Sequence, residues 1–224
     1  KILEISEKYK IPIIEDAAQS IGSKYFNKMA GSFGKIGCFS THPLKNLNAA
    51  GDGGFFVTND YRIYKKAQEM KNHGNVDRNR VNKFAYLSRM DAIQASILNF
   101  RLKSLDSVIK KRRANANYFL NHLDRSLFSL VDEKKNQFNS YHTFVIQTKK
   151  RDKLIKYLKK NGIGCAIHYP TPIHLQPAAK FLKHKKNSFP VTEVQSKKIL
   201  TIPVNQNLSL ENIKYIVKVM NNFK

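Results

Sequence analysis

Apolar residues follow two spacings along the first half of the chain, and each spacing predicts a different element. Short apolar runs bounded by turn residues predict three strands, at residues 11–14, 36–40 and 55–58. Apolar residues at helical spacing predict helices over residues 1–10, 61–72 and 88–123. The first strand is expected to be buried on both faces, as in a parallel sheet. The last helix, capped by Ser88, is expected to bend near residues 105–106.

The second half of the chain alternates strands and helices on a smaller scale. Strands are predicted at residues 141–148 and 163–169, and helices at residues 152–161, 191–200 and from 210 onwards. Asp152 is the predicted N-cap of the helix at residues 152–161, and Ser209 is that of the helix from residue 210 onwards. In the first half of the chain, Asp60 is the predicted N-cap of the helix at residues 61–72. This pattern predicts an α/β fold with two domains, residues 1–110 and 111–224.

Composition narrows the class of protein. With 14 Phe and 10 Tyr in 224 residues, the chain is too aromatic to be disordered throughout. No apolar stretch approaches the roughly 18 residues of a membrane-spanning helix, and no signal peptide is recognised. Two cysteines, Cys38 and Cys165, are too few for a disulfide framework or a zinc knuckle, and both are expected to be small buried hydrophobes. No metal site or membrane contact is expected, and the location expected is the reducing cytoplasm.

The net charge of +24 is unusual and has two readings. It favours an anionic partner such as nucleic acid, an acidic membrane surface or a phosphorylated small molecule. It is also what an A/T-rich coding sequence produces without selection for binding. The basic runs at residues 110–113 and 183–186 contain no aromatic residue, whereas single-stranded nucleic acid is bound by stacking on aromatic rings. Nucleic acid is therefore not the expected partner.

Candidate chemistry gathers where the first two predicted strands end. Asp16 follows the first strand, Ser40 ends the second, and Lys45 lies five residues later in a loop of small and polar residues. Ligands of open α/β sheets bind at the carboxyl ends of strands. Pyridoxal 5'-phosphate (PLP) needs this pair, because a lysine amine forms a Schiff base with its aldehyde and a carboxylate binds its protonated ring nitrogen. On spacing alone, a lysine in a loop is more often a solvated surface charge, and an aspartate at a strand end is more often a turn or cap residue than a ligand.

Several motifs in order give a more specific indication. Residues 13–22 and 31–47 resemble the aspartate and lysine motifs of the DegT–DnrJ–StrS family of sugar aminotransferases, and further matches occur at residues 51–60, 72–74, 88–95 and 167–177. The resemblance implies a fold-type I, PLP-dependent transferase. It also implies that the family's N-terminal part has no counterpart here, which leaves the large-domain sheet incomplete beside a smaller C-terminal α/β lobe. Residues 1–110 would then be the C-terminal part of the PLP-binding domain.

The same resemblance assigns roles residue by residue. Lys45 matches the lysine of the PLP aldimine, Asp16 the acid on the ring nitrogen, and Ser40 the serine that binds the phosphate. Gln19 matches the residue that contacts the phenolic oxygen, and Ala18 lies with it among the cofactor-binding residues. Weaker matches assign substrate contacts to His168, Tyr169 and His42.

The implied reaction moves an amino group from L-glutamate to a nucleotide-linked keto sugar, with a 3-keto sugar favoured over a 4-keto sugar. It would serve the biosynthesis of cell-surface polysaccharide or amino sugars, in a homodimer. One departure concerns the family's Gly-x-Asn before Ser-Arg, whose Asn reaches the phosphate of the partner subunit's cofactor. Ala85 and Leu87 stand there. The alternatives are an inactive fragment, a regulatory PLP-binding relative without turnover and, more remotely, a basic nucleic-acid-binding protein.

Overall fold

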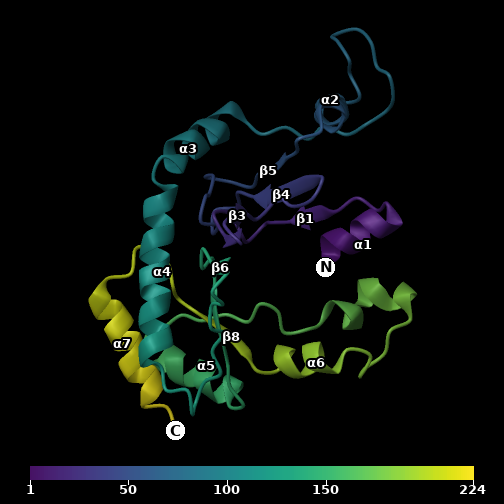
Figure 1. Ribbon diagram of the computed structural model, residues 1–224. Coiled ribbons are helices and arrows are strands. Elements are labelled where there is room, and N and C mark those ends of the chain that lie inside the picture. Colours follow the sequence, from purple (N-terminus) through teal and green to yellow (C-terminus); the bar gives the residue numbers. More distant parts are fainter. The chain divides into compact units, whose positions relative to one another are not determined.

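The chain divides into two units in the computed structural model, which describes residues 1–224 (Figure 1). Unit 1 comprises Lys1–Lys110 and Lys134–Ser140, and unit 2 comprises Lys111–Glu133 and Tyr141–Lys224. Helix α4 (Leu105–His122) contributes residues to both units. Unit 1 has two sheets, unit 2 has one, and each unit has its own apolar cluster, so each is described separately.

Unit 1 contains most of the strands. Its helices are α1 (Ile2–Tyr9), α2 (Tyr61–Met70) and α3 (Ala92–Leu102). Its strands are β1 (Ile14–Asp16), β2 (Lys24–Tyr25), β3 (Lys28–Met29), β4 (Ile36–Ser40), β5 (Gly54–Val57) and β6 (Gln137–Phe138). One sheet has the order β1-β4-β5 and the other β3-β2-β6. In the first sheet β4 runs parallel to β1 and antiparallel to β5, with Asp16 opposite Cys38.

The first strand differs from the expectation. It was expected at residues 11–14 and buried on both faces, but β1 begins at Ile14, whose side chain is 64% exposed. Pro12 has no backbone N–H to donate to a ladder, which favours a later start. Since β1 pairs with β4 alone, it is an edge strand, and no further strand of this chain covers it.

The helices of unit 1 also begin and end differently. Asp60 is the N-cap of α2 as predicted, because its carboxylate accepts a hydrogen bond from the Arg62 N–H at 2.9 Å, but α2 ends at Met70. The long helix predicted over residues 88–123 is two helices, α3 and α4, and Ser88 does not cap α3, which begins after Asp91. Between them the Ser104 hydroxyl donates to the Arg101 carbonyl at 3.0 Å, a local bond that competes with helix continuation.

Unit 2 is built around a continuous apolar core. Its remaining helices are α5 (Arg151–Lys160), the 3₁₀ turns η1 (Ile173–Leu175) and η2 (Pro177–Leu182), α6 (Pro190–Ser196) and α7 (Leu210–Asn221). Its strands, β7 (Phe144–Gln147) and β8 (Ile199–Ile202), pair antiparallel. Helices α4, α5 and α7 and both strands contribute fully buried side chains, among them Phe119, Ile146, Leu154, Leu200 and Met220.

Two predicted elements of unit 2 are wrong, one predicted N-cap is corrected and one is confirmed. Residues 163–169 form no strand, and only Ala166 makes a bridge, to Thr201. The helix predicted over residues 191–200 is α6 followed by β8, whose residues alternate half-buried and buried opposite β7. Helix α5 begins at Arg151, so Asp152 lies in its first turn and is not its N-cap. Ser209 caps α7 as predicted, because its hydroxyl accepts from the Asn212 N–H at 3.1 Å.

Two expectations from composition can be compared with the structure. Cys38 and Cys165 are free thiols, but both are half-buried, not fully buried. Burial raises the pKa of the Cys165 thiol. None of the helices is both long enough and apolar enough to cross a membrane.

Candidate cofactor site

The predicted acid and hydroxyl lie at the ends of neighbouring strands. Strands β1 and β4 are parallel, so Asp16 and Ser40 both lie at their carboxyl ends. The ladder continues past Asp16, because the Ala17 N–H donates to the Cys38 carbonyl at 2.8 Å. Asp16 is exposed and Ser40 half-buried. This is the edge of the sheet at which an open α/β fold binds its ligand.

The loop that carries Lys45 is tied to the sheet at its base. The Thr41 N–H donates to the Gly53 carbonyl at 2.9 Å, and the Thr41 carbonyl accepts from the Ala49 N–H at 2.8 Å. Within the loop the Lys45 N–H donates to the His42 carbonyl at 2.8 Å. These bonds leave the Lys45 side chain half-buried next to the carboxyl ends of β1 and β4.

Helix α3 holds the same loop from a second side. Arg101 donates to the carbonyls of Asn48 and Ala49 at 2.7 and 3.3 Å. The Gln94 side-chain oxygen accepts from the Ala50 N–H at 2.8 Å. Gln94 and Arg101 are seven positions apart, which places them on one face of α3 two turns apart. Neither residue is among those predicted from the sequence; their spacing marks a polar face on a mainly apolar helix but does not identify the loop that this face contacts.

The pKa of the Lys45 amine is lowered from the usual value for lysine. Partial burial lowers its pKa, while the negative charge of Asp16 opposes that change by raising it, and the pKa remains below the usual value for lysine. Two consequences follow. A larger fraction of the amine is neutral near pH 7 than for an exposed lysine, and the Asp16 carboxylate lies within electrostatic reach of it.

The donor set fits PLP. An amine suits its aldehyde, a carboxylate suits its ring nitrogen, and a hydroxyl at a strand end suits its phosphate. Both oxygen groups are oriented by local backbone bonds, since Asp16 accepts from the Ala18 N–H at 3.1 Å and Ser40 from the His42 N–H at 3.3 Å. These side chains would therefore meet the cofactor in fixed orientations.

The other predicted cofactor residues lie nearby, with less evidence for their roles. Gln19 is exposed and Ala18 half-buried in the turn that follows β1. His42 is satisfied locally, because its Nδ1 accepts from the Leu44 N–H at 3.2 Å. Leu87 is 51% exposed, and its backbone forms a bridge with Asn72. The roles assigned to these residues stay predictions.

The two predicted substrate residues with the weaker assignment belong to unit 2. His168 is exposed, with its Nδ1 at 2.9 Å from the Thr201 hydroxyl oxygen. Tyr169 is 67% exposed and its ring meets that of His168 edge-on. Their contact with substrate stays a prediction.

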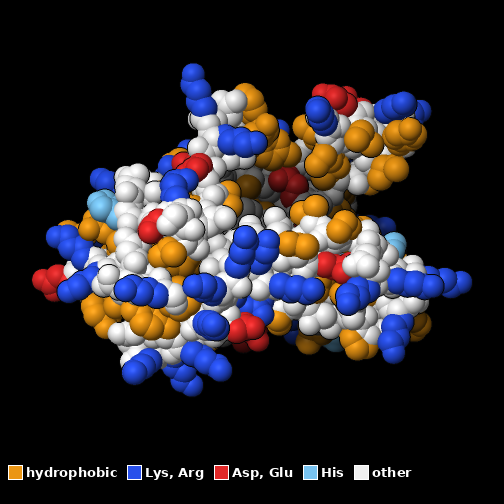
Figure 2. Space-filling model, turned by 90° about the horizontal axis from the view of Figure 1, so that it is seen from below, with side chains coloured by type: hydrophobic (Ala, Val, Ile, Leu, Met, Phe, Trp, Pro, Cys, Tyr) orange, Lys and Arg blue, Asp and Glu red, His pale blue; other side chains and the backbone are white.

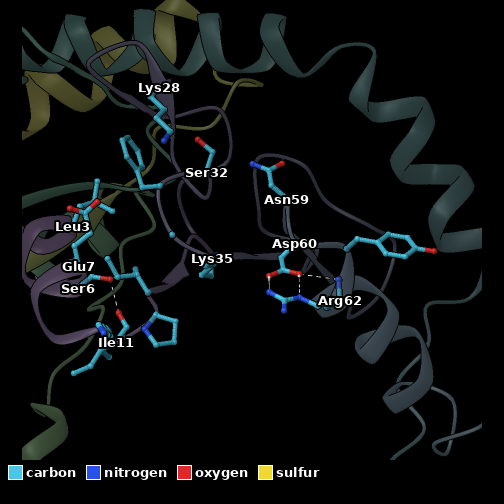
Figure 3. Close-up of a pocket in the computed structure, with 16 residues that line it drawn as sticks. Leu3, Ser6, Glu7, Ile11, Lys28, Ser32, Lys35, Asn59, Asp60 and Arg62 are labelled. Atoms are coloured by element: carbon cyan, nitrogen blue, oxygen red, sulfur yellow. Dashed lines mark hydrogen bonds and ion pairs between the residues drawn. The ribbon is translucent and has the colours of Figure 1, made fainter.

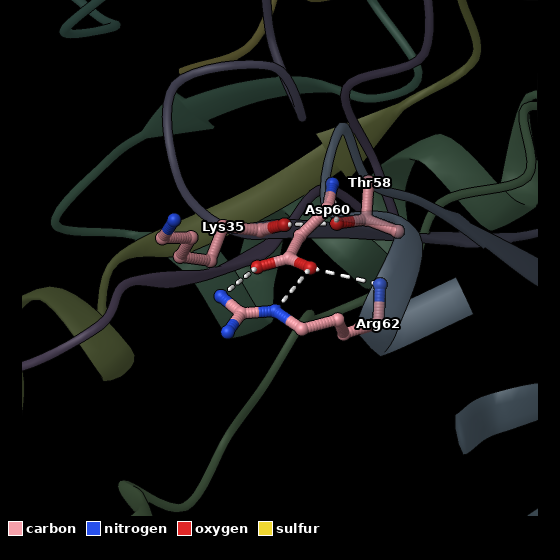
Figure 4. A network of polar contacts seen from close by, with 4 residues as sticks. All are labelled: Lys35, Thr58, Asp60 and Arg62. Carbon is pink, nitrogen blue, oxygen red and sulfur yellow. Dashed lines mark hydrogen bonds and ion pairs between the residues drawn. The ribbon is translucent and has the colours of Figure 1, made fainter. Parts of the chain in front are cut away.

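A cavity of about 860 Å³ lies at the amino ends of β1 and β4, at the opposite end of these strands from Asp16 and Ser40 (Figure 3). Its lining comes from residues before β1 and β4 and after β5, whereas Asp16 and Ser40 lie at the other ends of β1 and β4. Asp60 and Arg62 form an ion pair on its wall at 3.4 Å, and the Thr58 hydroxyl beside them donates to the Lys35 carbonyl at 2.7 Å (Figure 4). Since none of the predicted cofactor residues lines this cavity, it is distinct from the Lys45 site.

One face of the molecule shows how the basic side chains are arranged there. On the face shown in Figure 2, Lys and Arg side chains are spread among hydrophobic and uncharged groups and do not gather in one groove. A dispersed distribution is what compositional bias produces, whereas a nucleic-acid site concentrates charge on one face.

Comparison with known proteins assigns the chain to a family. Residues 1–221 match the DegT/DnrJ/EryC1/StrS aminotransferase family. A pleiotropic regulatory protein of Geobacillus stearothermophilus is 34% identical, over 99% of this chain and 60% of its own length. A UDP-N-acetyl-3-dehydro-alpha-D-glucosamine 3-aminotransferase of Acidithiobacillus ferrooxidans is 36% identical, over 98% of this chain and 59% of its own length.

A solved structure of a further protein superimposes on nearly the whole of this chain. DesV of S. venezuelae, crystallised in complex with a ketimine intermediate, superimposes with a TM-score of 0.92 at 30% identity, over 98% of this chain and 60% of that chain. The α/β fold is therefore that of sugar aminotransferases. The chain spans about 60% of the length of the relatives that it matches.

Proposed function

Because this chain belongs to the DegT/DnrJ/EryC1/StrS aminotransferase family, we propose that it acts in the PLP-dependent transfer of an amino group to a nucleotide-linked keto sugar. The observation that carries the proposal is the half-buried Lys45 amine, whose pKa is lowered by burial and which senses the charge of Asp16. A structural lysine in a loop needs neither partial burial nor a carboxylate at a strand end. Both are useful for an amine that must react with an aldehyde near neutral pH.

Each side chain of the site has a defined task in this proposal. PLP, when bound, supplies an aldehyde that condenses with amines and a ring that withdraws electrons. Lys45 would hold that aldehyde through Nζ and, once free, move the proton of the substrate's α-carbon, a role typically worth about 10²- to 10⁴-fold in rate. Asp16 would hold a proton on the ring nitrogen, and Ser40 would donate to the phosphate. Gln19 would contact the phenolic oxygen, with Ala18 beside it.

The finer assignments are also proposals. The net reaction converts a keto sugar and L-glutamate into an amino sugar and 2-oxoglutarate. A 3-keto sugar is favoured because the Acidithiobacillus relative bears the name of a 3-aminotransferase. His168, Tyr169 and His42 would contact the sugar. We further propose that unit 1 belongs to a larger fold-type I PLP-binding domain, and that the protein works as a cytoplasmic homodimer.

Chemical trapping tests the proposal. Purified protein is incubated with PLP, reduced with borohydride, digested and mapped by mass spectrometry. We expect the reduced cofactor on Lys45 and on no other lysine at comparable yield. Lys66 on α2, an exposed lysine in the same unit, offers a matched control: Lys45→Arg should lose the label and Lys66→Arg should keep it. Label spread over many surface lysines would contradict the assignment.

A second candidate follows from the Geobacillus relative, which is named a regulatory protein. A regulatory PLP-binding protein would give the same label on Lys45, so trapping cannot separate the two. The half-reaction with glutamate does separate them, because only an aminotransferase releases 2-oxoglutarate in an amount equal to the bound cofactor. Release of 2-oxoglutarate from the wild type, and none from Lys45→Arg, would favour the enzyme.

A further inference from the structure

Glu15 lies next to Asp16 in β1 and has an unusual set of partners. Its carboxylate accepts three backbone hydrogen bonds, from the N–H groups of Gly31, Phe33 and Gly34, at 2.5 to 2.7 Å. These donors lie in the loop that leads into β4, the parallel partner of β1. No other side chain of β1 makes a bond to that loop. Glu15 therefore ties its own strand to the start of the neighbouring strand.

The loop can approach this closely only because of its glycines. Gly31 has a φ of +86°, in the left-handed region that favours glycine. Gly37, opposite Glu15 in the register of the two strands, is covered by the same loop, since a Cβ there would meet the Gly31 carbonyl oxygen at 2.0 Å. The backbone of residues 31–34 is thus folded onto the sheet, with its N–H groups turned toward Glu15.

Successive backbone N–H groups of this kind form a concave anion site. In many proteins such a loop binds a phosphate, but here the anion is part of the chain. The Glu15 side chain is half-buried and accepts with both carboxylate oxygens, so the N–H groups of Gly31, Phe33 and Gly34 are already occupied and do not bind an external anion. The N–H groups of the loop therefore hold the Glu15 carboxylate and do not bind a ligand.

We propose that Glu15 is a positioning residue for Asp16, an inference that rests on the proposed function. Neighbouring residues of a strand point to opposite faces, so fixing the Glu15 carboxylate on the loop side fixes the direction of the Asp16 carboxylate on the other. The anchor matters because β1 has three residues, pairs on one side only, and exposes 64% of Ile14. Without Glu15, no side-chain hydrogen bond would join β1 to β4 or to the loop before it.

The substitution Glu15→Gln tests this link while keeping the shape of the side chain. Glutamine offers one acceptor oxygen and places an NH₂ group against backbone donors, so at least one of the three hydrogen bonds is lost. In cofactor-free protein we expect faster hydrogen exchange at the amides of Gly31, Phe33 and Gly34. PLP affinity, measured by absorbance titration, should fall roughly tenfold. Glu7→Gln, an equal charge change on the exposed face of α1, should alter neither.

A double-mutant cycle with Asp16→Asn separates positioning from general stabilisation. If Glu15 acts through Asp16, the double variant binds PLP no more weakly than Asp16→Asn alone, because the positioned group is already gone. Effects that multiply would overturn the proposal, and so would unchanged exchange at the three amides. If Glu15→Gln does not fold, Glu15→Asp keeps the charge on a shorter side chain and is carried through the same cycle. Failure of the proposed function is recognised separately, as wild-type protein that leaves no reduced PLP on Lys45, and the inference then falls with it.

Discussion

The two units stabilise themselves by different means. Unit 2 encloses 19 buried apolar residues in one cluster, and eight of them are fully buried side chains of Phe, Ile, Leu or Met on its helices and strands. The apolar cluster of unit 1 has three buried members, Leu47, Ala49 and Leu98, although unit 1 is the larger of the two. In unit 1 the three side chains Phe55, Phe56 and Val57 of β5 are each about 40% exposed.

Unit 1 has polar side-chain bonds to backbone on both sides of β4, in the loop before this strand and in the loop that carries Lys45. Glu15, Gln94 and Arg101 together accept from or donate to six backbone groups in the two loops that flank β4. Apolar burial stabilises without direction, whereas hydrogen bonds fix orientation. The proposed site in unit 1 needs such orientation, and its loops are held by directed bonds with little apolar core of their own.

The largest effect on stability should come from removing a core ring of unit 2. Phe119 on α4 is fully buried and packs on Phe144, with ring centroids 5.2 Å apart. Phe119→Ala should lower the free energy of unfolding of unit 2 by about 3–5 kcal/mol. Urea unfolding followed by circular dichroism measures this change.

The matched variant in unit 1 sharpens the comparison. Phe55→Ala removes a ring that is 38% exposed and stacked on Phe39 at 5.0 Å. It should cost less than half as much as Phe119→Ala, because part of that ring already contacts water. Equal losses in the two variants would mean that unit 1 depends on apolar burial as much as unit 2 does.

A smaller effect is expected from the polar support of the Lys45 loop. Arg101→Met keeps an unbranched side chain on α3 but removes the donors to the Asn48 and Ala49 carbonyls. Hydrogen exchange should accelerate at the amides of residues 45–51, by the equivalent of about 1.5 kcal/mol in opening free energy. Lys103→Met, two residues later and exposed, is the control and should leave exchange unchanged. An unchanged loop in Arg101→Met would show that the bonds at its base are sufficient.

The sequence predicts the parts of the fold that depend on local chemistry. Residues 36–40 form β4 as predicted, Asp60 and Ser209 cap their helices, and Asp16 and Ser40 lie at neighbouring strand ends. Local chemistry does not distinguish β8 from the end of a helix, because a four-residue run with three apolar members fits either until a partner strand pairs with it. Residues 163–169 fail for the same reason, since only one residue finds a partner.

Some residues of the candidate site are predicted by local sequence patterns, and others depend on contacts between distant parts of the chain. Lys45 and Asp16 can be found from strand ends and motif order. Gln94 and Arg101 cannot be assigned to the Lys45 loop from the sequence, because the residues that they contact are 44 to 53 positions away. The role of Glu15 depends on the path of the loop at residues 31–34, which only the folded backbone shows.

Removal of the Asp16 charge should change the titration of Lys45. The carboxylate favours the protonated amine, so Asp16→Asn should lower the pKa of Lys45 further below its usual value. Below that pKa the fraction of neutral amine then rises, and Lys45 should react a few-fold faster with acetic anhydride at a fixed pH. Competitive labelling across a pH series, on cofactor-free protein, gives the midpoint. Asp52→Asn changes an exposed carboxylate of the same loop and should leave the Lys45 midpoint unchanged. A higher Lys45 midpoint in Asp16→Asn would contradict the electrostatic role given to Asp16.

The smallest effect concerns a helix cap in the well-packed unit. The Ser209 hydroxyl accepts from the Asn212 N–H at the start of α7, a helix that buries five side chains. Ser209→Ala should lower the free energy of unfolding of unit 2 by about 1 kcal/mol, measured by urea unfolding, because one N–H at the helix start loses its partner. Ser209→Asp should restore the loss, since aspartate accepts the same bond and its charge suits the positive end of the helix. If Ser209→Ala leaves the free energy of unfolding unchanged, the cap contributes nothing that the apolar face of α7 does not already supply.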